Sequence, residues 1–331
     1  MSALLLAAIS SSAAAQIILK VSTWVPRTHA LSKTQAKWCE SVAVVSNGRI
    51  RCNILDKAPV PPPQTLEAVA SGELDVSFTV HGYTPGRFVM TQMAELPVLG
   101  NHAEAISVAY QRMNNRYPQF AAEHQGVKIL SLFTHGPGGV YTSKKPFVTL
   151  ADVQGVPMRI GGGMASELAK TMGIQGVLKP SSEIAELLKT GAVEGVLFPA
   201  ESIEAFKIDK IVRYGTTFSG GLYNTSFVFM MNQDRYNKLS PEDRKVIDQV
   251  SGEAIARSFG RAWDDADRKG MAYMQVAQVA LRPADAKLTA ELKAKLAPLE
   301  QRWIEQAKAS GLSDPAKMLA EFRAEITRLD K

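Results

Sequence analysis

Residues 149–172 read TLADVQGVPMRIGGGMASELAKTM, which is a loop, a short apolar strand, a glycine-rich turn and a helix with apolar periodicity in direct succession. A strand that turns straight into a helix is the unit of an α/β fold built on a parallel sheet. Arg159 lies at the end of this strand, beside the turn Gly161–Gly163. Because a guanidinium offers a planar fork of donors that matches a carboxylate, Arg159 is a candidate clamp for an organic anion. A surface position or a structural ion pair is the alternative interpretation.

The same alternation of strand and helix extends along the chain. We expect strands at 17–22, 49–55, 74–80, 127–133, 195–198 and 227–232, and helices at 28–46, 65–71, 164–172 and 181–190. Ser240 and Pro241 begin a helix that could run to about residue 280, with Gly252, Gly260 and Gly270 as possible kinks. A charged helical tail follows at 287–329. At 331 residues the chain exceeds one ordinary core of roughly 100–200 residues, so the sequence predicts two α/β lobes.

Four candidate binding residues follow or end predicted strands. In open α/β sheets, ligands bind beyond the carboxyl ends of the strands. Trp24 follows the first strand, His81 and Tyr83 follow the strand at 74–80, and Arg159 ends the strand at 156–160. We therefore expect these side chains to border one crevice.

Charge, the N-terminal segment and the cysteines indicate the compartment of the protein and the classes of partner it could bind. The net charge is +6, but Lys and Arg are scattered among acidic residues, so no basic stripe indicates nucleic acid; the charge is compatible with drawing small anions to a cleft. Residues 1–15 resemble a secretory signal peptide cleaved before Gln16, which predicts a periplasmic protein. No basic segment precedes its apolar run, so a start upstream of Met1 stays open. Cys39 and Cys52 could form a disulfide there, although spacing alone leaves this open.

No motif in the sequence convincingly predicts a catalytic, metal-binding or phosphate-binding function. Residues 161–166 imitate a dinucleotide fingerprint, but Ser166 stands in place of the third glycine. The five histidines lack metal-ligand spacing, and no Gly-x-Ser-x-Gly elbow occurs. The sequence therefore favours a binding protein without cofactor or metal over an enzyme, and a nucleotide-dependent enzyme is the weaker alternative.

Eight short segments of the chain form a combined pattern, namely residues 18–26, 47–50, 72–76, 85–88, 150–160, 187–195, 231–232 and 239–242. Together they resemble the solute receptor of tripartite ATP-independent periplasmic (TRAP) transporters. The segment 150–160 resembles the family's L-x-D-x-x-G-x-K-x-R strand, and 187–195 resembles its L-x-T-G-x-V-D-G turn. Each segment is short, but the combination covers nearly the whole chain after residue 16.

The resemblance implies a two-lobed periplasmic binding protein fold, type II-like, with the lobes joined by hinge strands and a long helix. We expect residues 16–136 and 225–264 to form lobe I, and residues 137–224 and 265–331 to form lobe II. Such receptors close over one organic acid anion and deliver it to inner-membrane permease subunits. The receptor of an ATP-driven importer is the alternative with the same fold.

The resemblance also implies that Arg159 makes the ionic contact with the ligand carboxylate. Trp24, Phe198 and Tyr223 would form walls of the pocket, and His81, Tyr83 and Asn224 would supply hydrogen bonds. Family members that bind sugar acids often carry a second arginine where this chain has Pro137–Gly139. We therefore expect a monocarboxylate with an apolar or hydroxylated body. Arg87, which follows the loop beside the crevice, is the residue that could reach inward as a second cation.

Overall fold

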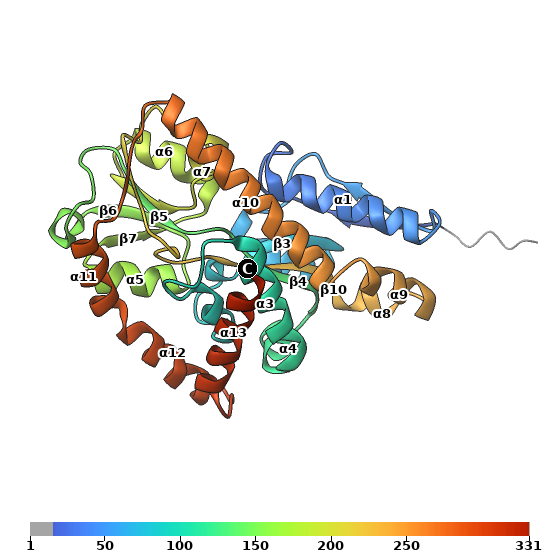
Figure 1. Cartoon of the computed structure of the whole chain (residues 1–331). Helices are drawn as coiled ribbons and strands as arrows, with labels where there is room; N and C mark the ends of the chain where they lie inside the picture. The colour runs from blue at the N-terminus through green and yellow to red at the C-terminus, as the bar shows by residue number, and fades with distance from the viewer. Residues whose placement is uncertain (1–15, 331) are drawn as a thin grey trace, which may run out of the picture.

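The structure is a computed structural model that describes residues 16–330. The predicted signal peptide at 1–15 lies outside the described residues. The chain builds two sheets that lie side by side, each covered by helices (Figure 1). No helix within 16–330 is both long enough and apolar enough to cross a bilayer.

The first sheet has the order β2-β1-β3-β10-β4 and the second has the order β11-β9-β5-β8-β6-β7. The strands of the first are β1 (Ile17–Val21), β2 (Ile50–Ile54), β3 (Val76–Val80), β4 (Val127–Thr134) and β10 (Ser226–Asn232). Those of the second are β5 (Gly139–Thr142), β6 (Pro157–Ile160), β7 (Gln175–Leu178), β8 (Gly195–Phe198), β9 (Tyr214–Thr217) and β11 (Ala280–Pro283). Five of the nine strand pairings are parallel, as the alternation of strand and helix predicts, and the mixed α/β class is confirmed.

Each sheet also holds one strand that runs against its neighbours. In the first sheet β10 is antiparallel to β3 and β4, and in the second β5 is antiparallel to β8 and β9. These strands begin directly after the chain changes sheets, between β4 and β5 and again between β9 and β10. The amino ends of β5 and β10 therefore face the gap between the sheets, where the carboxyl ends of the parallel strands also lie.

Helices α1 to α4 belong to the first half of the chain, and α5 to α7 accompany the second sheet (Figure 1). Their bounds are α1 Ala30–Val45, α2 Thr65–Ala70, α3 Ala103–Arg116, α4 Gln119–Glu123, α5 Met164–Met172, α6 Ile184–Lys189 and α7 Ser202–Ala205. The later helices are α8 Gln233–Asn237, α9 Pro241–Gln249, α10 Glu253–Val276, α11 Ala286–Leu296, α12 Pro298–Ala309 and α13 Pro315–Leu329. Short 3-10 segments, including Met90–Glu95, fill several loops.

The long helix α10 crosses both lobes (Figure 1). The helix predicted from Ser240 breaks at Gly252, whose φ of +65° favours glycine, so α9 and α10 are separate. α10 runs without a break through Gly260 and Gly270. A Cβ atom on Gly260 would lie 2.4 Å from Glu104 Cα, and one on Gly270 would lie 2.6 Å from Glu201 Cα. The two glycines therefore let one helix pack closely against α3 and against the segment after β8.

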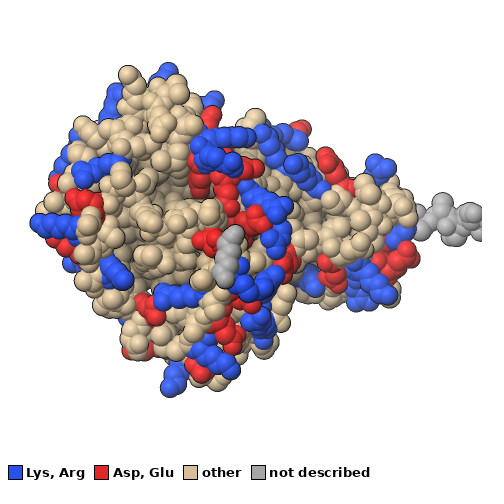
Figure 2. All heavy atoms as spheres, viewed as in Figure 1, with Lys and Arg blue, Asp and Glu red and all other residues tan. Residues whose placement is uncertain are grey.

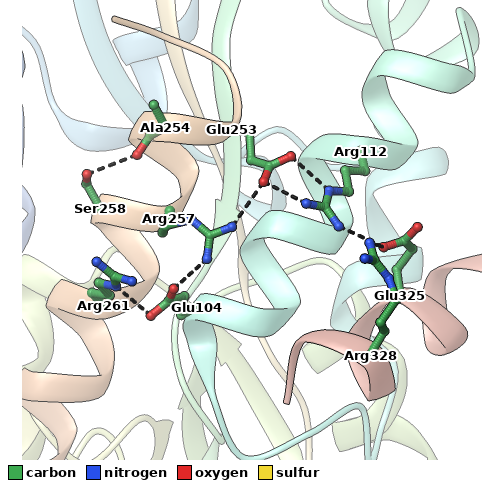
Figure 3. Close-up of polar contacts among 9 residues, drawn as sticks. All are labelled: Glu104, Arg112, Glu253, Ala254, Arg257, Ser258, Arg261, Glu325 and Arg328. Carbon is green, nitrogen blue, oxygen red and sulfur yellow. Dashed lines mark hydrogen bonds and ion pairs between the residues drawn. The ribbon is translucent and has the colours of Figure 1, made fainter. Parts of the chain in front are cut away.

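Ion pairs join α3 to both α10 and α13 (Figure 3). Arg112 contacts Glu253 at 2.7 Å and Glu325 at 2.9 Å. Arg328, together with Arg112 and Arg116, lowers the pKa of Glu325 to about 2. Basic and acidic side chains are accordingly mixed on this face of the molecule (Figure 2). α13 packs on α3, which brings the end of the 265–331 segment next to the first sheet. The lobe boundaries given in the sequence analysis remain a prediction.

The structure joins Cys39 and Cys52 in a disulfide, which the sequence left open. The bond links α1 to β2 on the outer side of the first sheet. In α1, Trp38 and Val42 face inward, and Trp38 packs edge-on against Phe229 of β10 at 5.0 Å between ring centroids. The disulfide therefore fastens the helix that covers this part of the core.

Candidate ligand-binding site

A cavity lies between the two sheets. Its wall combines residues that follow β1, β3 and β4 of the first sheet with residues of β6 and β8 of the second. Aromatic rings form much of this wall, contributed by Trp24, Phe198, Phe206, Tyr223, Phe227 and Trp263. A larger hollow lies beside α11 and α12, but its charged residues are solvent-exposed or paired, as in Arg323 with Glu300. The cavity between the sheets is therefore the better candidate site.

Arg159 is the charged centre of this cavity. Pairing of β6 with β7 and β8 holds its backbone, and only 3% of the residue is exposed. Its Nε donates to the carbonyl of Lys179 at 2.7 Å, and its guanidinium carbon lies 4.8 Å from the ring centroid of Phe198. Among residues 16–330 no carboxylate forms an ion pair with Arg159. A buried cation without a counter-ion is costly, so this position is suited to an anionic ligand.

Tyr83 and Thr225 extend the donor set beside Arg159. The hydroxyl of Tyr83 accepts a hydrogen bond from Ser181 N at 3.1 Å and one from Arg159 Nη2 at 3.3 Å, which leaves its own proton free to donate. A Cβ atom on Gly161 would lie 3.8 Å from both Nη atoms of Arg159 and 4.0 Å from Thr225 Oγ1. The missing side chain of Gly161 thus leaves space next to the guanidinium, bordered by donors that suit a carboxylate.

The cavity also contains a histidine with a free acceptor. His135 Nδ1 donates to the carbonyl of Gly136 at 2.5 Å, and its Nε2 is buried without a hydrogen-bond partner among the described residues. Burial lowers the pKa of His135 to about 4, although the hydrogen bond to Gly136 and the charge of Glu201 act to raise it; the charge of Arg159 lowers it further. The ring is therefore neutral at neutral pH, with a lone pair on Nε2.

Glu201 places one carboxylate in the same wall. Its Oε1 accepts from the hydroxyl of Ser202 at 2.6 Å, and its Oε2 lies 3.5 Å from Nε2 of His29. His29 itself accepts from Leu31 N through Nδ1, so it caps α1 and turns Nε2 toward Glu201. Both oxygens of Glu201 already face polar partners, and its charge disfavours a second anion in the cavity.

Five of the seven predicted site residues line this cavity, namely Trp24, Tyr83, Arg159, Phe198 and Tyr223. The other two do not. Both ring nitrogens of His81 are engaged, with Ser226 Oγ at 2.9 Å and His124 Nε2 at 2.9 Å, and the Asn224 amide donates to the carbonyls of His135 and Gly136. The hydrogen bonds expected from His81 and Asn224 to a ligand are therefore not supported by their positions.

Arg87 does not reach the cavity either. It donates to the carbonyl of Glu123 at 3.1 Å and to that of Gln125 at 2.9 Å, away from Arg159. The sequence analysis missed His29, His135 and Glu201. His135 follows β4 directly and Glu201 follows β8 closely, so the rule that selected His81 would also have selected these two.

Glu95 closes the contact between the lobes beside the cavity. Its Oε2 accepts from Met164 N at 2.7 Å, at the start of α5, and its Oε1 accepts from Ser226 N at 3.0 Å. A Cβ atom on Gly163 would lie 2.2 Å from Glu95 Oε2, and one on Gly162 would lie 2.0 Å from the carbonyl oxygen of Gly82. The backbone of Gly82 and the carboxylate of Glu95 thus contact this turn directly, and Glu95 already accepts the N–H at the start of α5 that a nucleotide phosphate would use.

Two lobes that enclose a cavity with one unpaired cation define a receptor for a small anion. Residues 21–306 match the family described as bacterial extracellular solute-binding protein, family 7, and the chain belongs to this family. It is a family of solute-binding receptors rather than of enzymes. The match confirms the predicted solute receptor of the TRAP type and supports it over the receptor of an ATP-driven importer.

Solved structures similar to this chain are TRAP solute-binding proteins. One from Bordetella bronchiseptica, with bound (R)-mandelate and (S)-mandelate, is 39% identical, covers 95% of this chain and 100% of its own, and has a TM-score of 0.92. One from a marine metagenome, specific for aromatic acid ligands and solved with 3-hydroxybenzoate, is 32% identical over 96% of this chain and 100% of its own, with a TM-score of 0.89. One from Rhodoferax ferrireducens, with copurified benzoate, is 28% identical over 95% of this chain and 98% of its own, with a TM-score of 0.88. The predicted two-lobed fold is thereby confirmed.

Proposed function

We propose that this protein is a periplasmic receptor that captures an aromatic monocarboxylate and delivers it to the membrane permease of a TRAP transporter, without catalysing a reaction. In this proposal residues 1–15 are its signal peptide. The observation that carries the proposal is the buried guanidinium of Arg159, which has no counter-ion among residues 16–330 and lies in a cavity walled by aromatic rings.

The donors around Arg159 support a carboxylate at this position. Two of the five guanidinium protons are used, by Lys179 and Tyr83, so three remain for a ligand. The proton of Tyr83 and the hydroxyl of Thr225 add two further donors. A carboxylate accepts about four hydrogen bonds, so this donor set suits one such group.

The rest of the wall supports an apolar body with a single charge. Outside the group of donors around Arg159, the cavity is bordered chiefly by aromatic rings such as those of Trp24, Phe198 and Phe206. A second carboxylate would be buried against these rings and Glu201 without a cationic partner, at a cost of several kcal/mol. The aromatic acids bound by the relatives from Bordetella and the marine metagenome agree with this preference.

We further propose that the two lobes close over the ligand, with lobe I formed by 16–136 and 225–264 and lobe II by 137–224 and 265–331. The hinges would be the crossings near 134–138 and 223–226. Contacts that link the lobes beside the cavity, such as Glu95 to Met164 and Tyr83 to Ser181, support this closure. Small-angle scattering should give a smaller radius of gyration when ligand is saturating; an unchanged radius would contradict the closure.

A thermal-unfolding screen tests the ligand class. Benzoate, mandelate and phenylacetate should raise the unfolding temperature, and succinate and glucuronate should do so much less. A ligand at about 100 times its Kd adds roughly 2.7 kcal/mol of apparent stability, which such a screen detects readily. Tenfold tighter calorimetric binding of succinate or glucuronate than of every aromatic acid would contradict the proposal.

A further inference from the structure

We infer that the cavity recognises a hydroxyl group of the ligand in addition to its carboxylate, and that His135 Nε2 is the acceptor for that hydroxyl. The ligand class is then a hydroxylated aromatic monocarboxylate. This inference rests on the proposed function, because it requires an aromatic acid to occupy the cavity at Arg159.

The first observation is an unsatisfied acceptor. His135 is 3% exposed, it lines the cavity, and its Nε2 has no partner within residues 16–330. Buried polar atoms are nearly always hydrogen-bonded, and leaving one unpaired is unfavourable. A polar atom left unpaired in a ligand cavity is therefore expected to meet a group of the ligand.

The second observation is that the ring cannot turn to satisfy itself elsewhere. Its Nδ1 is fixed on the carbonyl of Gly136 at the crossing between the sheets. Its faces and edges pack against Tyr223, with ring centroids 5.4 Å apart, and against Trp263 at 5.8 Å. Since a carbonyl only accepts, Nδ1 carries the proton, and the neutral ring offers a lone pair at Nε2.

The chemistry of the partner follows from this lone pair. A carboxylate oxygen cannot pair with it, because both are acceptors, so the ligand must bring a donor other than its charged end. A hydroxyl needs one acceptor and carries no charge. An ammonium group would need about three acceptors. Here the oxygens of Glu201 already face Ser202 and His29. Asn224 Oδ1 and Asp267 Oδ2 also lack partners within residues 16–330, but these two residues do not line the cavity, whereas His135 does.

Two pairs of acids isolate the hydroxyl. Mandelate and phenylacetate differ by the hydroxyl on the carbon next to the carboxylate, and 3-hydroxybenzoate and benzoate differ by a hydroxyl on the ring. The wild-type protein should bind the hydroxylated member of at least one pair about ten- to a hundredfold more tightly by calorimetry at pH 7.5. Equal affinities within both pairs would overturn this inference but leave the proposed function standing. Failure of all four acids to bind would remove the proposed function itself.

Two substitutions test the acceptor. His135→Phe keeps a planar ring but has no lone pair, so the preference for the hydroxylated acid within each pair should fall to less than threefold. His135→Gln places an amide oxygen near the position of Nε2 and should restore part of the preference. The unfolding temperature of each variant without ligand checks that it folds. The assignment would be overturned if His135→Phe kept the wild-type preference for the hydroxylated acid, or if Tyr223→Phe alone abolished that preference. It would also be overturned if phenylglycine, which carries an ammonium group in place of the hydroxyl, bound as tightly as mandelate.

Discussion

Replacing Arg159 by methionine removes the charge from the cavity while keeping an unbranched side chain of similar length. The three guanidinium protons that Lys179 and Tyr83 leave unused are the ones we assign to the ligand carboxylate. Without them, a buried carboxylate keeps only the hydroxyls of Tyr83 and Thr225. Truncating one member of a buried charged pair costs about 2–5 kcal/mol, so Kd for benzoate should rise by roughly one and a half to three and a half orders of magnitude.

Calorimetric titration of benzoate into both proteins measures this change, with unfolding temperatures as a check on the fold. Arg159→Lys should lie between wild type and methionine, because an ammonium keeps the charge but loses the planar fork. Arg87→Ala is the matched control, since the Arg87 guanidinium donates to two surface carbonyls outside the cavity. Affinity within threefold of wild type in Arg159→Met would refute the assignment of Arg159 to the ligand.

Three further outcomes follow from particular contacts. Glu95→Gln should weaken the binding of benzoate by about tenfold in a calorimetric titration. In either orientation the amide places its NH2 group against the N–H of Met164 or against that of Ser226. Equal affinity would show that this contact does not stabilise the ligand-bound form. Replacing Cys39 and Cys52 by serine should lower the free energy of unfolding in urea by about 3 kcal/mol, and a change below about 1 kcal/mol would mean that the bond adds little to stability. The folded-state pKa of His135, about 4, lies below the ordinary 6.5, so this residue destabilises the fold as pH falls from 7 to 5. Over that range the free energy of unfolding of the wild type should fall by about 2 kcal/mol relative to that of His135→Phe. A difference between the two proteins that stays constant with pH would contradict the neutral buried ring.

Much of the fold and the central residue of the candidate site could be predicted from local sequence. The strand before Gly161 and the turn after it are adjacent in the chain, so the position of Arg159 at a strand end could be read directly. Trp24 and Phe198 could be expected in the wall because they lie at or just after the carboxyl ends of strands. The disulfide depended on the geometry between α1 and β2, which a spacing of 13 residues does not fix.

The misassigned residues depended on contacts between distant segments. His81 and His135 both follow apolar strands, and nothing local tells them apart. His81 is engaged by Ser226, 145 residues away, and by His124, 43 residues away, whereas His135 keeps Nε2 free. Likewise, the nucleotide-like turn is occupied by Glu95, which lies 69 residues before Met164 in the chain.

A crystal structure of the protein with benzoate or mandelate bound tests the central claim most directly. The account predicts the ligand carboxylate within about 3 Å of both Nη atoms of Arg159, with Tyr83 donating to the same group and the aromatic ring of the ligand against Trp24 and Phe198. A ligand carboxylate placed elsewhere, or an acidic side chain of the protein paired with Arg159 in the complex, would contradict it.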